Sequence, residues 1–491
     1  MKKIIPLSAM LMASVYMTTV SADSLPVVGL LKNSTLSSLP NGLPFPNASG
    51  FASTVSTAGR IDLSNEFFQD LGTNGRRCVS CHLPSAGWTV TPLQIQAVFD
   101  LTLGGVINDG LGLGAIFRLN DGANSPNADV STVSARRKAY SMLLTKGLIR
   151  VGIGIPANAD FELIEVDDPY GYASVAELSL FRRPLPTTNL KFLSTVMWDG
   201  RETFIDTSAT PDHCNIAAES GKCFQSIHFD LSDQANNATT GHAQGMPLTN
   251  DQRESIVAFE TALNTAQIWD NKAGLLRTSV AFGGPQKIIA QPFYYGINDN
   301  LGDYQTSLPF NADVFNLYAG WTNSNAPSKA AIARGEHLFN DRKITISGVA
   351  GLNGSVGSPF NPPLPDTFVG SCTTCHDTPN AGNHSIVAPL NIGLADASKR
   401  TPDMPLYTLR NKETGAVVQT TDPGRALITG KFVDIGKFKG PILRGLAARA
   451  PYFHNGLAVD LDTVVNFYND RFNMKLTNQE HRDLVAFLRT L

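Results

Sequence analysis

The residues whose spacing most clearly indicates chemistry form two Cys-x-x-Cys-His pentapeptides, at 78–82 and 372–376. In this pattern two thiols can bond to the two vinyl groups of one haem, as in c-type cytochromes. The histidine that follows is then placed beneath the iron as an axial ligand. Because the chain has only 6 Cys and 9 His, two complete copies of the pattern indicate two covalently attached haems. The predicted attachment thiols and iron ligands are Cys78, Cys81 and His82 in the first motif, and Cys372, Cys375 and His376 in the second.

Cys214 and Cys223 are the two cysteines that the motifs leave over. In an exported protein such a pair is expected to form a disulfide that closes a small surface loop. A metal site using His213 and Cys214 is the alternative, although this spacing matches no common ligand set. We therefore predict a disulfide.

The first 22 residues have the pattern of a secretory signal peptide. Lys2 and Lys3 precede a largely apolar run, and small residues precede a cleavage site after Ala22. Loss of the two lysines changes the net charge from −3 to −5, and a mildly acidic surface disfavours nucleic acid as a partner. No later stretch approaches the ~20 apolar residues of a membrane span. We expect a soluble protein exported to the periplasm.

Helices and loops must position these motifs. Helical spacing of apolar residues predicts helices over 134–148, 251–266 and 330–339, and a last helix begins at a Thr477-x-x-Glu480 capping box. The 42 glycines and 29 prolines indicate many loops. The predicted fold is mainly α-helical and loop-rich, with two c-type cytochrome-like domains that carry one covalent haem each.

Similar short helical openings, at 65–72 and 330–339, precede the two motifs and indicate a duplicated haem module. The predicted divisions are a signal peptide over 1–22, an N-terminal arm or linker over 23–55, a first haem domain over 56–325 that contains the Cys214 and Cys223 loop, and a second haem domain over 326–491.

Several segments outside the haem motifs resemble those of one family, and they are specific only in combination. They are Arg-Pro-Leu-Pro-Thr-Thr-Asn at 183–189, Val-Met-Trp-Asp-Gly-Arg at 196–201, Lys-Gly-Pro-Ile-Leu-Arg-Gly at 439–445, Ala-Pro-Tyr-Phe-His-Asn-Gly at 450–456 and Val-Val-Asn-Phe-Tyr at 464–468. Together they are similar to the bacterial dihaem cytochrome c peroxidase and MauG-type family.

The resemblance implies roles for residues between and beside the haems. Trp198 would connect the two haems, although an indole at this position could also be a core aromatic. Arg201 and Arg444 would pair with haem propionates, because a guanidinium matches carboxylate geometry, or would form surface salt bridges. His454 resembles a family position near the propionate of the second haem.

The chain departs from the peroxidases in the distal pocket of the first haem. The resemblance implies a glutamate shortly after a Leu-x-x-Gln-Ala segment, but no Asp or Glu occurs over 235–250. An ungapped count places Gln244 at that position, and an amide cannot exchange a proton. His242 is the nearby titratable group. It could act as a general acid–base, bind iron as a sixth ligand, or be a surface histidine.

At the second haem, Tyr468 stands where the family places the distal ligand. Peroxidases use Met there, whereas MauG-type proteins use Tyr, and a phenolate stabilises more oxidised iron than a thioether does. Met474 and Met404 are the alternatives, and a buried structural tyrosine is a third reading. A calcium between the haems is also common in the family, but Arg183 and Arg449 stand near the corresponding positions and argue against it.

The function implied by the resemblance is peroxide-dependent oxidoreduction at the first haem. Electrons would arrive from a small periplasmic donor protein, pass through the second haem and reach hydrogen peroxide or a similar small oxidant. A MauG-type oxidation of a protein or small organic substrate is the second enzymatic reading. A non-enzymatic electron carrier, with both irons six-coordinate, is a third.

Overall fold

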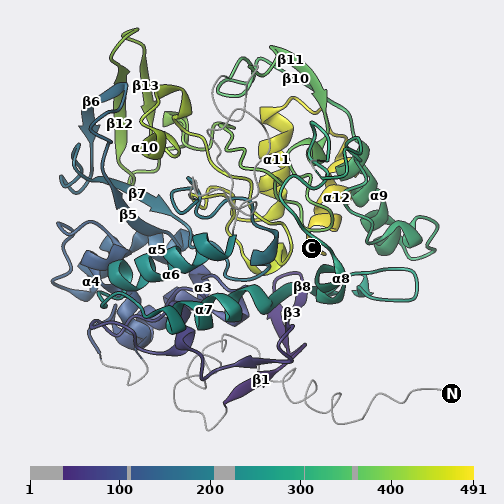
Figure 1. The fold of residues 1–491 in the computed structure, drawn as a ribbon, viewed down its shortest axis with the longest axis horizontal. Coiled ribbons are helices and arrows are strands. Elements are labelled where there is room, and N and C mark those ends of the chain that lie inside the picture. The colour runs from purple at the N-terminus through teal and green to yellow at the C-terminus, as the bar shows by residue number, and fades with distance from the viewer. Residues whose placement is uncertain (1–36, 108–111, 204–226, 304, 356–362) are drawn as a thin grey trace.

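A computed structural model of the chain describes residues 37–107, 112–203, 227–303, 305–355 and 363–491 (Figure 1). The predicted signal peptide, His213 and the Cys214–Cys223 pair lie outside these residues, so the predicted disulfide stays a prediction. The described structure is 32% helix and 17% strand. Helices therefore predominate as expected, but the strand content exceeds what the sequence patterns indicated.

The helices form two groups (Figure 1), and each group packs against one Cys-x-x-Cys-His motif. The first group consists of α3 (Pro92–Thr102), α4 (Val133–Ala139), α5 (Ser141–Lys146), α6 (Ile227–His242) and α7 (Asn250–Ala262). The second consists of α9 (Pro327–Asp341), α11 (Leu461–Arg471) and α12 (Asn478–Leu488). Short helices α8 (Pro285–Ala290) and α10 (Ala426–Thr429) lie in the connections. Among the helices of the described residues, none combines the length and apolarity needed to cross a membrane.

The last helices of the two groups repeat one sequence pattern. The predicted capping box at Thr477 and Glu480 is confirmed, and Thr249 and Gln252 form the same device at the start of α7. Ile-Val-Ala-Phe at 256–259 corresponds to Leu-Val-Ala-Phe at 484–487. Each phenylalanine packs against a partner from the helical segment ahead of the motif. The ring centroids are 5.2 Å apart for Phe67 and Phe259, and 5.7 Å apart for Phe339 and Phe487.

Two of the predicted helices have different boundaries in the structure. The helix expected over 134–148 is divided at Tyr140 into α4 and α5, and it ends where Gly147 adopts a left-handed conformation. The helix expected over 251–266 ends at Ala262, because residues 263–270 form a strand.

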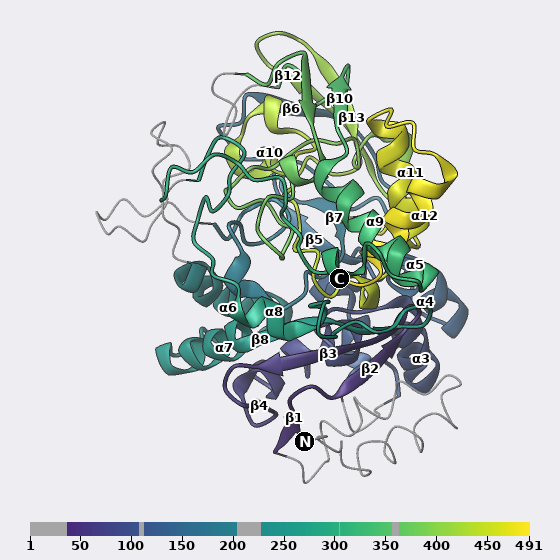
Figure 2. The ribbon, with the colours of Figure 1, turned by 90° about the vertical axis from the view of Figure 1, so that its right-hand side faces the viewer.

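Strands join segments that are far apart in the sequence. A three-stranded antiparallel sheet has the order β13-β12-β6, and a four-stranded sheet has the order β2-β3-β8-β9. In both views β6 and β12 lie towards one end of the molecule, away from β3 (Figures 1 and 2). The strands of these two sheets are β6 (Phe161–Asp167), β12 (Leu406–Asn411) and β13 (Val417–Thr420), then β2 (Pro44–Asn47), β3 (Gly50–Ser56), β8 (Leu263–Asp270) and β9 (Gly274–Leu275). The remaining pairs are β1 (Ser38–Pro40) with β4 (Arg60–Asp62), β5 (Ile149–Ile153) with β7 (Leu178–Arg182), and β10 (Ile344–Ser347) with β11 (Thr367–Gly370).

These pairings bear on the predicted division of the chain. Residues 38–56, most of which we expected to be an arm or linker, form β1 to β3. Strand β12 of the predicted second domain pairs with β6 of the predicted first domain. The sheet of β6 and β12 therefore crosses the boundary predicted between 325 and 326.

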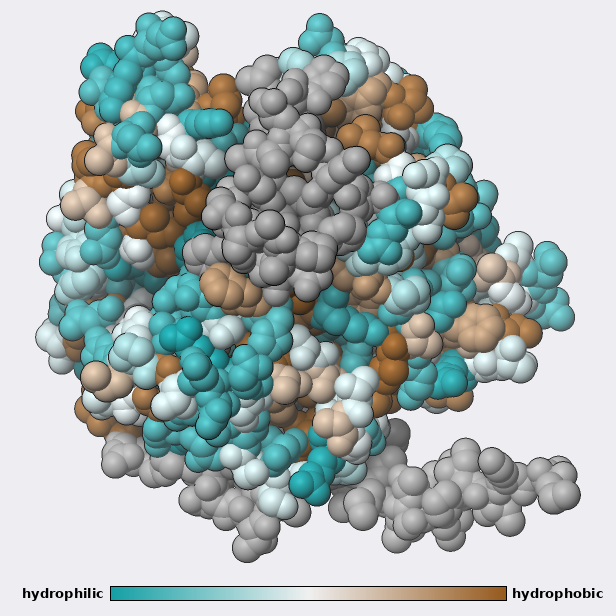
Figure 3. All heavy atoms as spheres, viewed as in Figure 1, coloured by the Kyte–Doolittle hydropathy of each residue, from teal (hydrophilic) through white to brown (hydrophobic). Residues whose placement is uncertain are grey.

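On the face seen in Figure 3, hydrophilic side chains cover much of the surface of the described residues.

A buried ion-pair network joins two neighbouring segments, at Arg182 and Asp199, to a distant one at Asp422. Arg182, at the end of β7, is 2% exposed and donates to Asp199 and to both carboxylate oxygens of Asp422, at 2.5, 2.7 and 2.9 Å. The two carboxylates are also buried. Since water cannot replace a lost partner here, the network must stay complete.

We expect Asp422→Asn to lower the free energy of unfolding by about 3–5 kcal/mol, because it leaves a buried guanidinium incompletely paired. Asp100 is a matched control, since its ion pair with Arg137 is exposed on both sides. Asp100→Asn should cost no more than about 1 kcal/mol. Chemical denaturation of both variants measures the difference, and equal losses would contradict a structural role for the network.

Candidate functional site

Each Cys-x-x-Cys-His motif lies in the wall of its own large cavity. Cys78, Cys81 and His82 line the first cavity, which has an empty volume of about 1560 Å³. Cys372, Cys375 and His376 line the second, which has an empty volume of about 1540 Å³. Both volumes include space that is open to solvent, and both cavities are lined mainly by apolar side chains.

The two motif histidines are oriented in the same way. Nδ1 of His82 lies 3.1 Å from the carbonyl oxygen of Trp88, and Nδ1 of His376 lies 2.6 Å from that of Gly382. Since a carbonyl oxygen can only accept, Nδ1 must carry the proton, and Nε2 keeps its lone pair for a metal. Burial lowers the pKa of both imidazoles to about 4, so both are neutral at physiological pH.

Burial raises the pKa of the Cys78, Cys372 and Cys375 thiols to about 12. Phe67 lies 6.3 Å from the ring of His82, and Phe339 lies 5.9 Å from that of His376. A neutral imidazole and two thiols in the wall of an apolar cavity are what a c-type haem requires. The residues of both sites therefore fit the cofactor predicted from the sequence.

Trp198 lies between the two cavities and lines both of them, together with Lys439 and Pro441. Its indole Nε1 donates to the carbonyl oxygen of Arg183 at 2.8 Å, which fixes the ring. The ring of His454 lies edge-on to it, with the centroids 6.2 Å apart. The indole thus occupies the position between the cavities that the sequence resemblance predicts.

His454 is 1% exposed and lines the second cavity. Its ring stacks on Phe438 with centroids 3.9 Å apart, and neither ring nitrogen has a hydrogen bond to protein.

The two arginines predicted to pair with haem propionates differ in their position relative to the cavities. Arg201 lines the first cavity and pairs with Asp199, whereas Arg444 lines neither cavity and donates to the carbonyl oxygen of Gly284. The structure therefore brings Arg201, but not Arg444, to a predicted haem site.

The two predicted distal residues of the first cavity are also separated. His242, the last residue of α6, lines the cavity. Gln244 does not line it and is exposed, with a positive φ of 52°. An ungapped count was misleading here because the chain turns sharply after α6, so the amide expected at the distal position lies at the surface.

Glu260 is an acid in the first cavity that the sequence prediction missed. It lies on α7, is 4% exposed, and lines the cavity with His242. Burial raises its pKa to about 8, so the carboxyl is protonated at neutral pH. Glu260 lies outside the 235–250 segment in which an acid was sought. The alignment of α7 with α12 would have found it, because Glu260 stands where the second module has Leu488.

The second cavity contains two of the three candidate distal ligands. Tyr468 of α11 and Met474 both line it. Met404 does not, since it packs with Met142, Leu148 and Phe181 in a separate cluster. Burial raises the pKa of the Tyr468 phenol, so this group ionises only if a cation nearby stabilises the phenolate.

The region where calcium was considered contains two buried arginines. Arg183 donates to the carbonyl oxygens of Lys146, Val90 and Arg449 at 2.7, 2.7 and 3.1 Å. These carbonyls therefore already have a cationic partner. The expectation against calcium stays a prediction.

Comparison with known proteins identifies the family. The cytochrome-c peroxidase IdrP1 of Pseudomonas sp. (strain SCT) is 32% identical over 287 residues, which cover 51% of this chain and 70% of that protein. The chain belongs to the bacterial dihaem cytochrome c peroxidase and MauG-type family. The resemblance predicted from the sequence is thereby confirmed. The cytochrome c551 peroxidase of Pseudomonas aeruginosa is 24% identical over 295 residues, which cover 54% of this chain and 73% of that protein.

Other relatives in the cytochrome c peroxidase family match over less of their length. For the cytochrome-c peroxidase IdrP2 of Denitromonas iodatirespirans the match is 32% identical and covers 26% of this chain and 37% of that protein. No family model matches the chain. A MauG-like protein associated with microbial copper homeostasis is similar in structure, with 17% identity, 65% of this chain and 76% of that chain covered, and a TM-score of 0.32. This TM-score is low, and the family assignment rests on the sequence relatives.

Burial of Glu260 has a testable effect on how the stability of this protein depends on pH. The folded protein raises the pKa of Glu260 from 4.5 to about 8, so it holds the proton more tightly than the unfolded chain does. The wild-type protein must therefore lose stability as the pH rises through this range, whereas Glu260→Gln lacks this loss. We expect the melting temperature of the variant, relative to that of the wild type, to rise by several degrees between about pH 5 and pH 8.

The matched control is Glu254→Gln, on the same helix. Glu254 is 60% exposed and pairs with His228 at the surface, so its variant should follow the wild-type pH dependence. Thermal unfolding monitored by circular dichroism gives both curves. A constant difference between Glu260→Gln and wild type across this pH range would show that the carboxyl is not held protonated by the fold.

Proposed function

We propose that this protein is an exported c-type cytochrome with two covalent haems that catalyses peroxide-dependent oxidoreduction. The observation that carries the proposal is the inequality of the two cavities. Both have a complete Cys-x-x-Cys-His motif, but the first adds His242 and Glu260, which can exchange protons, and the second adds Tyr468. Family membership supports the same chemistry, since the named relatives are cytochrome-c peroxidases.

The residues of the first cavity suit the reduction of peroxide. Hydrogen peroxide takes up two electrons and two protons to give two waters, so the site must supply protons as well as electrons. His82 would hold a haem iron, which would supply the electrons for O–O cleavage. His242 and the protonated carboxyl of Glu260 line the cavity and can donate and recover protons there. We therefore assign the proton transfer to these two residues and not to Gln244.

Electrons must reach the first cavity from outside. We infer that a small periplasmic electron-donor protein supplies them through the second haem, and that Trp198 connects the haems. Contact of the indole with both cavities supports this route. Periplasmic export rests on the signal pattern of residues 1–22.

A MauG-type oxidation of a protein or small organic substrate is the second candidate. The observation that favours it is Tyr468, whose phenol faces the second cavity where peroxidases have a methionine. An anionic phenolate ligand would favour oxidised over reduced iron at that site. In this reading the second haem would store oxidising equivalents and not deliver electrons.

The number of haems is measured directly by the pyridine haemochrome assay on protein of known concentration. We expect two haems per chain for the wild type and one for the double variant Cys372→Ala/Cys375→Ala, because the thioether bonds require these thiols. The double variant Cys214→Ala/Cys223→Ala is the control and should keep both. One haem in the wild type would show that only one motif is loaded.

The role of His242 is tested by steady-state turnover of peroxide with reduced cytochrome c. If His242 transfers protons, His242→Gln should lower kcat/KM for peroxide by about 10²–10⁴-fold with an unchanged haem content. His228→Gln is the matched control, since His228 lies on the same helix with a side chain that is 55% exposed. A rise in activity would identify His242 as a ligand that closes the iron site.

Wild-type spectra separate the enzymatic readings from the electron carrier. Two low-spin irons that bind neither peroxide nor, after reduction, carbon monoxide would contradict both enzymatic readings. Peroxide consumption without turnover of reduced cytochrome would favour the MauG-type reading over the peroxidase.

A further inference from the structure

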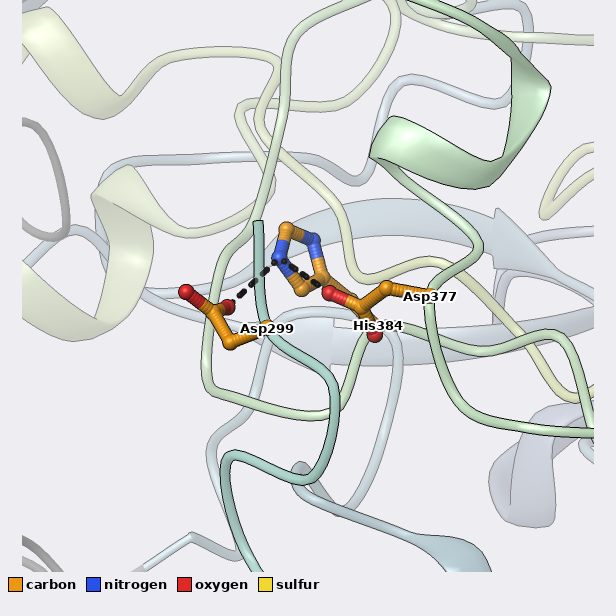
Figure 4. Close-up of side chains that lie close together, drawn as sticks. All are labelled: Asp299, Asp377 and His384. Atoms are coloured by element: carbon orange, nitrogen blue, oxygen red, sulfur yellow. Dashed lines mark ion pairs between the residues drawn. The ribbon is translucent and has the colours of Figure 1, made fainter. Parts of the chain in front are cut away.

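A cluster of two carboxylates and an imidazole lies beside the second haem motif (Figure 4). Asp377 directly follows His376, His384 lies on the same loop, and Asp299 comes from the segment between α8 and α9. The three residues are 0%, 8% and 4% exposed. One ligand atom from each lies within 4.8 Å of the others.

The atoms that face one another have no hydrogen bonds. Nε2 of His384 lies 3.2 Å from Oδ2 of Asp377 and 3.5 Å from Oδ2 of Asp299. Both contacts are buried ion pairs without hydrogen-bond geometry, and none of the three atoms has a hydrogen-bond partner in the protein. Two buried carboxylates around one imidazole carry more negative charge than a single imidazolium balances, which is costly, and a bound divalent cation would balance it.

The rest of each residue is held in place by backbone hydrogen bonds. The other carboxylate oxygens, Oδ1 of Asp377 and Oδ1 of Asp299, accept from the amides of Ser385 and Leu301 at 2.7 and 2.9 Å. The hydroxyl of Ser194 donates to the carbonyl oxygen of His384 at 2.7 Å. Each carboxylate is thus fixed by one oxygen and turns the other towards the imidazole (Figure 4).

We propose that Asp299, Asp377 and His384 bind a divalent first-row transition-metal ion, with Zn²⁺ as the probe, through the two Oδ2 atoms and Nε2. Bonds of about 2.0–2.2 Å in a tetrahedral site place neighbouring ligand atoms roughly 3.3–3.5 Å apart. The Nε2-to-Oδ2 separations of 3.2 and 3.5 Å are close to this geometry, and the three ligand atoms lie within 4.8 Å of one another. Two carboxylates with a neutral imidazole also balance the charge of a divalent ion, and a fourth position remains for water.

The ion would connect two loops that already touch. Asn298 donates to the carbonyl oxygen of Asp377 at 3.1 Å, and Asn300 donates to that of Thr374, inside the second motif, at 3.2 Å. The ligands form a set separate from His376, the predicted ligand of the haem iron, although His384 also lines the second cavity. The site therefore needs no redox activity and stands whether or not the proposed peroxidase function is correct.

The test uses the full-length, haem-loaded protein after dialysis against EDTA. Calorimetric titration with Zn²⁺ should give one ion per chain, and the melting temperature should rise by several degrees. Elemental analysis of the protein before dialysis should find up to one transition-metal ion beyond the haem iron. Asp299→Asn and His384→Gln should each weaken Zn²⁺ binding by more than about 100-fold and abolish the rise in melting temperature.

Two control variants exclude binding elsewhere. His337 and Asp341 form an exposed histidine–aspartate pair on α9, so His337→Gln should bind Zn²⁺ as the wild type does. The double variant Cys214→Ala/Cys223→Ala should also keep the ion. A wild-type protein whose melting temperature and calorimetric signal do not respond to Zn²⁺ would overturn the proposal, and this readout needs no variant to fold. Binding that survives both ligand variants would overturn it as well.

Discussion

The rest of the structure is organised around two neutral imidazoles, each of which must face one apolar cavity in a fixed orientation. The carbonyl oxygens of Trp88 and Gly382 meet this need, because each accepts the Nδ1 proton of one motif histidine. The phenylalanine pairs behind the motifs, Phe67 with Phe259 and Phe339 with Phe487, pack each group of helices around its own site. Both cavities are lined mainly by apolar side chains, which a bound cofactor would cover.

The two modules share a helix pattern but differ at the position that matters for chemistry. In α12 the helix presents Leu488 to its cavity, and in α7 the same position presents Glu260. A single carboxyl in an apolar wall is held protonated by burial. The first cavity thus contains a protonated carboxyl and the second a phenol, while the two motif histidines are held in the same way.

Features determined by local sequence could be predicted, and features determined by contacts between distant segments could not. The haem motifs and the capping box at Thr477 depend on residues a few positions apart. The position of Gln244 depended on a turn after α6 that a count along the chain cannot see. Glu260 and the cluster of Asp299, Asp377 and His384 become visible only when segments far apart in the sequence are brought together.

The antiparallel pairing of β6 with β12 has a consequence for how the chain acquires its structure. The paired residues, such as Val166 and Tyr407, are separated by about half of the chain. Contacts of such long sequence separation form late and slow the search for the native topology. The first Cys-x-x-Cys-His motif is therefore synthesised long before the sheet of β6 and β12 can close. The local contacts of this motif, such as that of His82 Nδ1 with the carbonyl oxygen of Trp88, need no residue of that sheet and can form first.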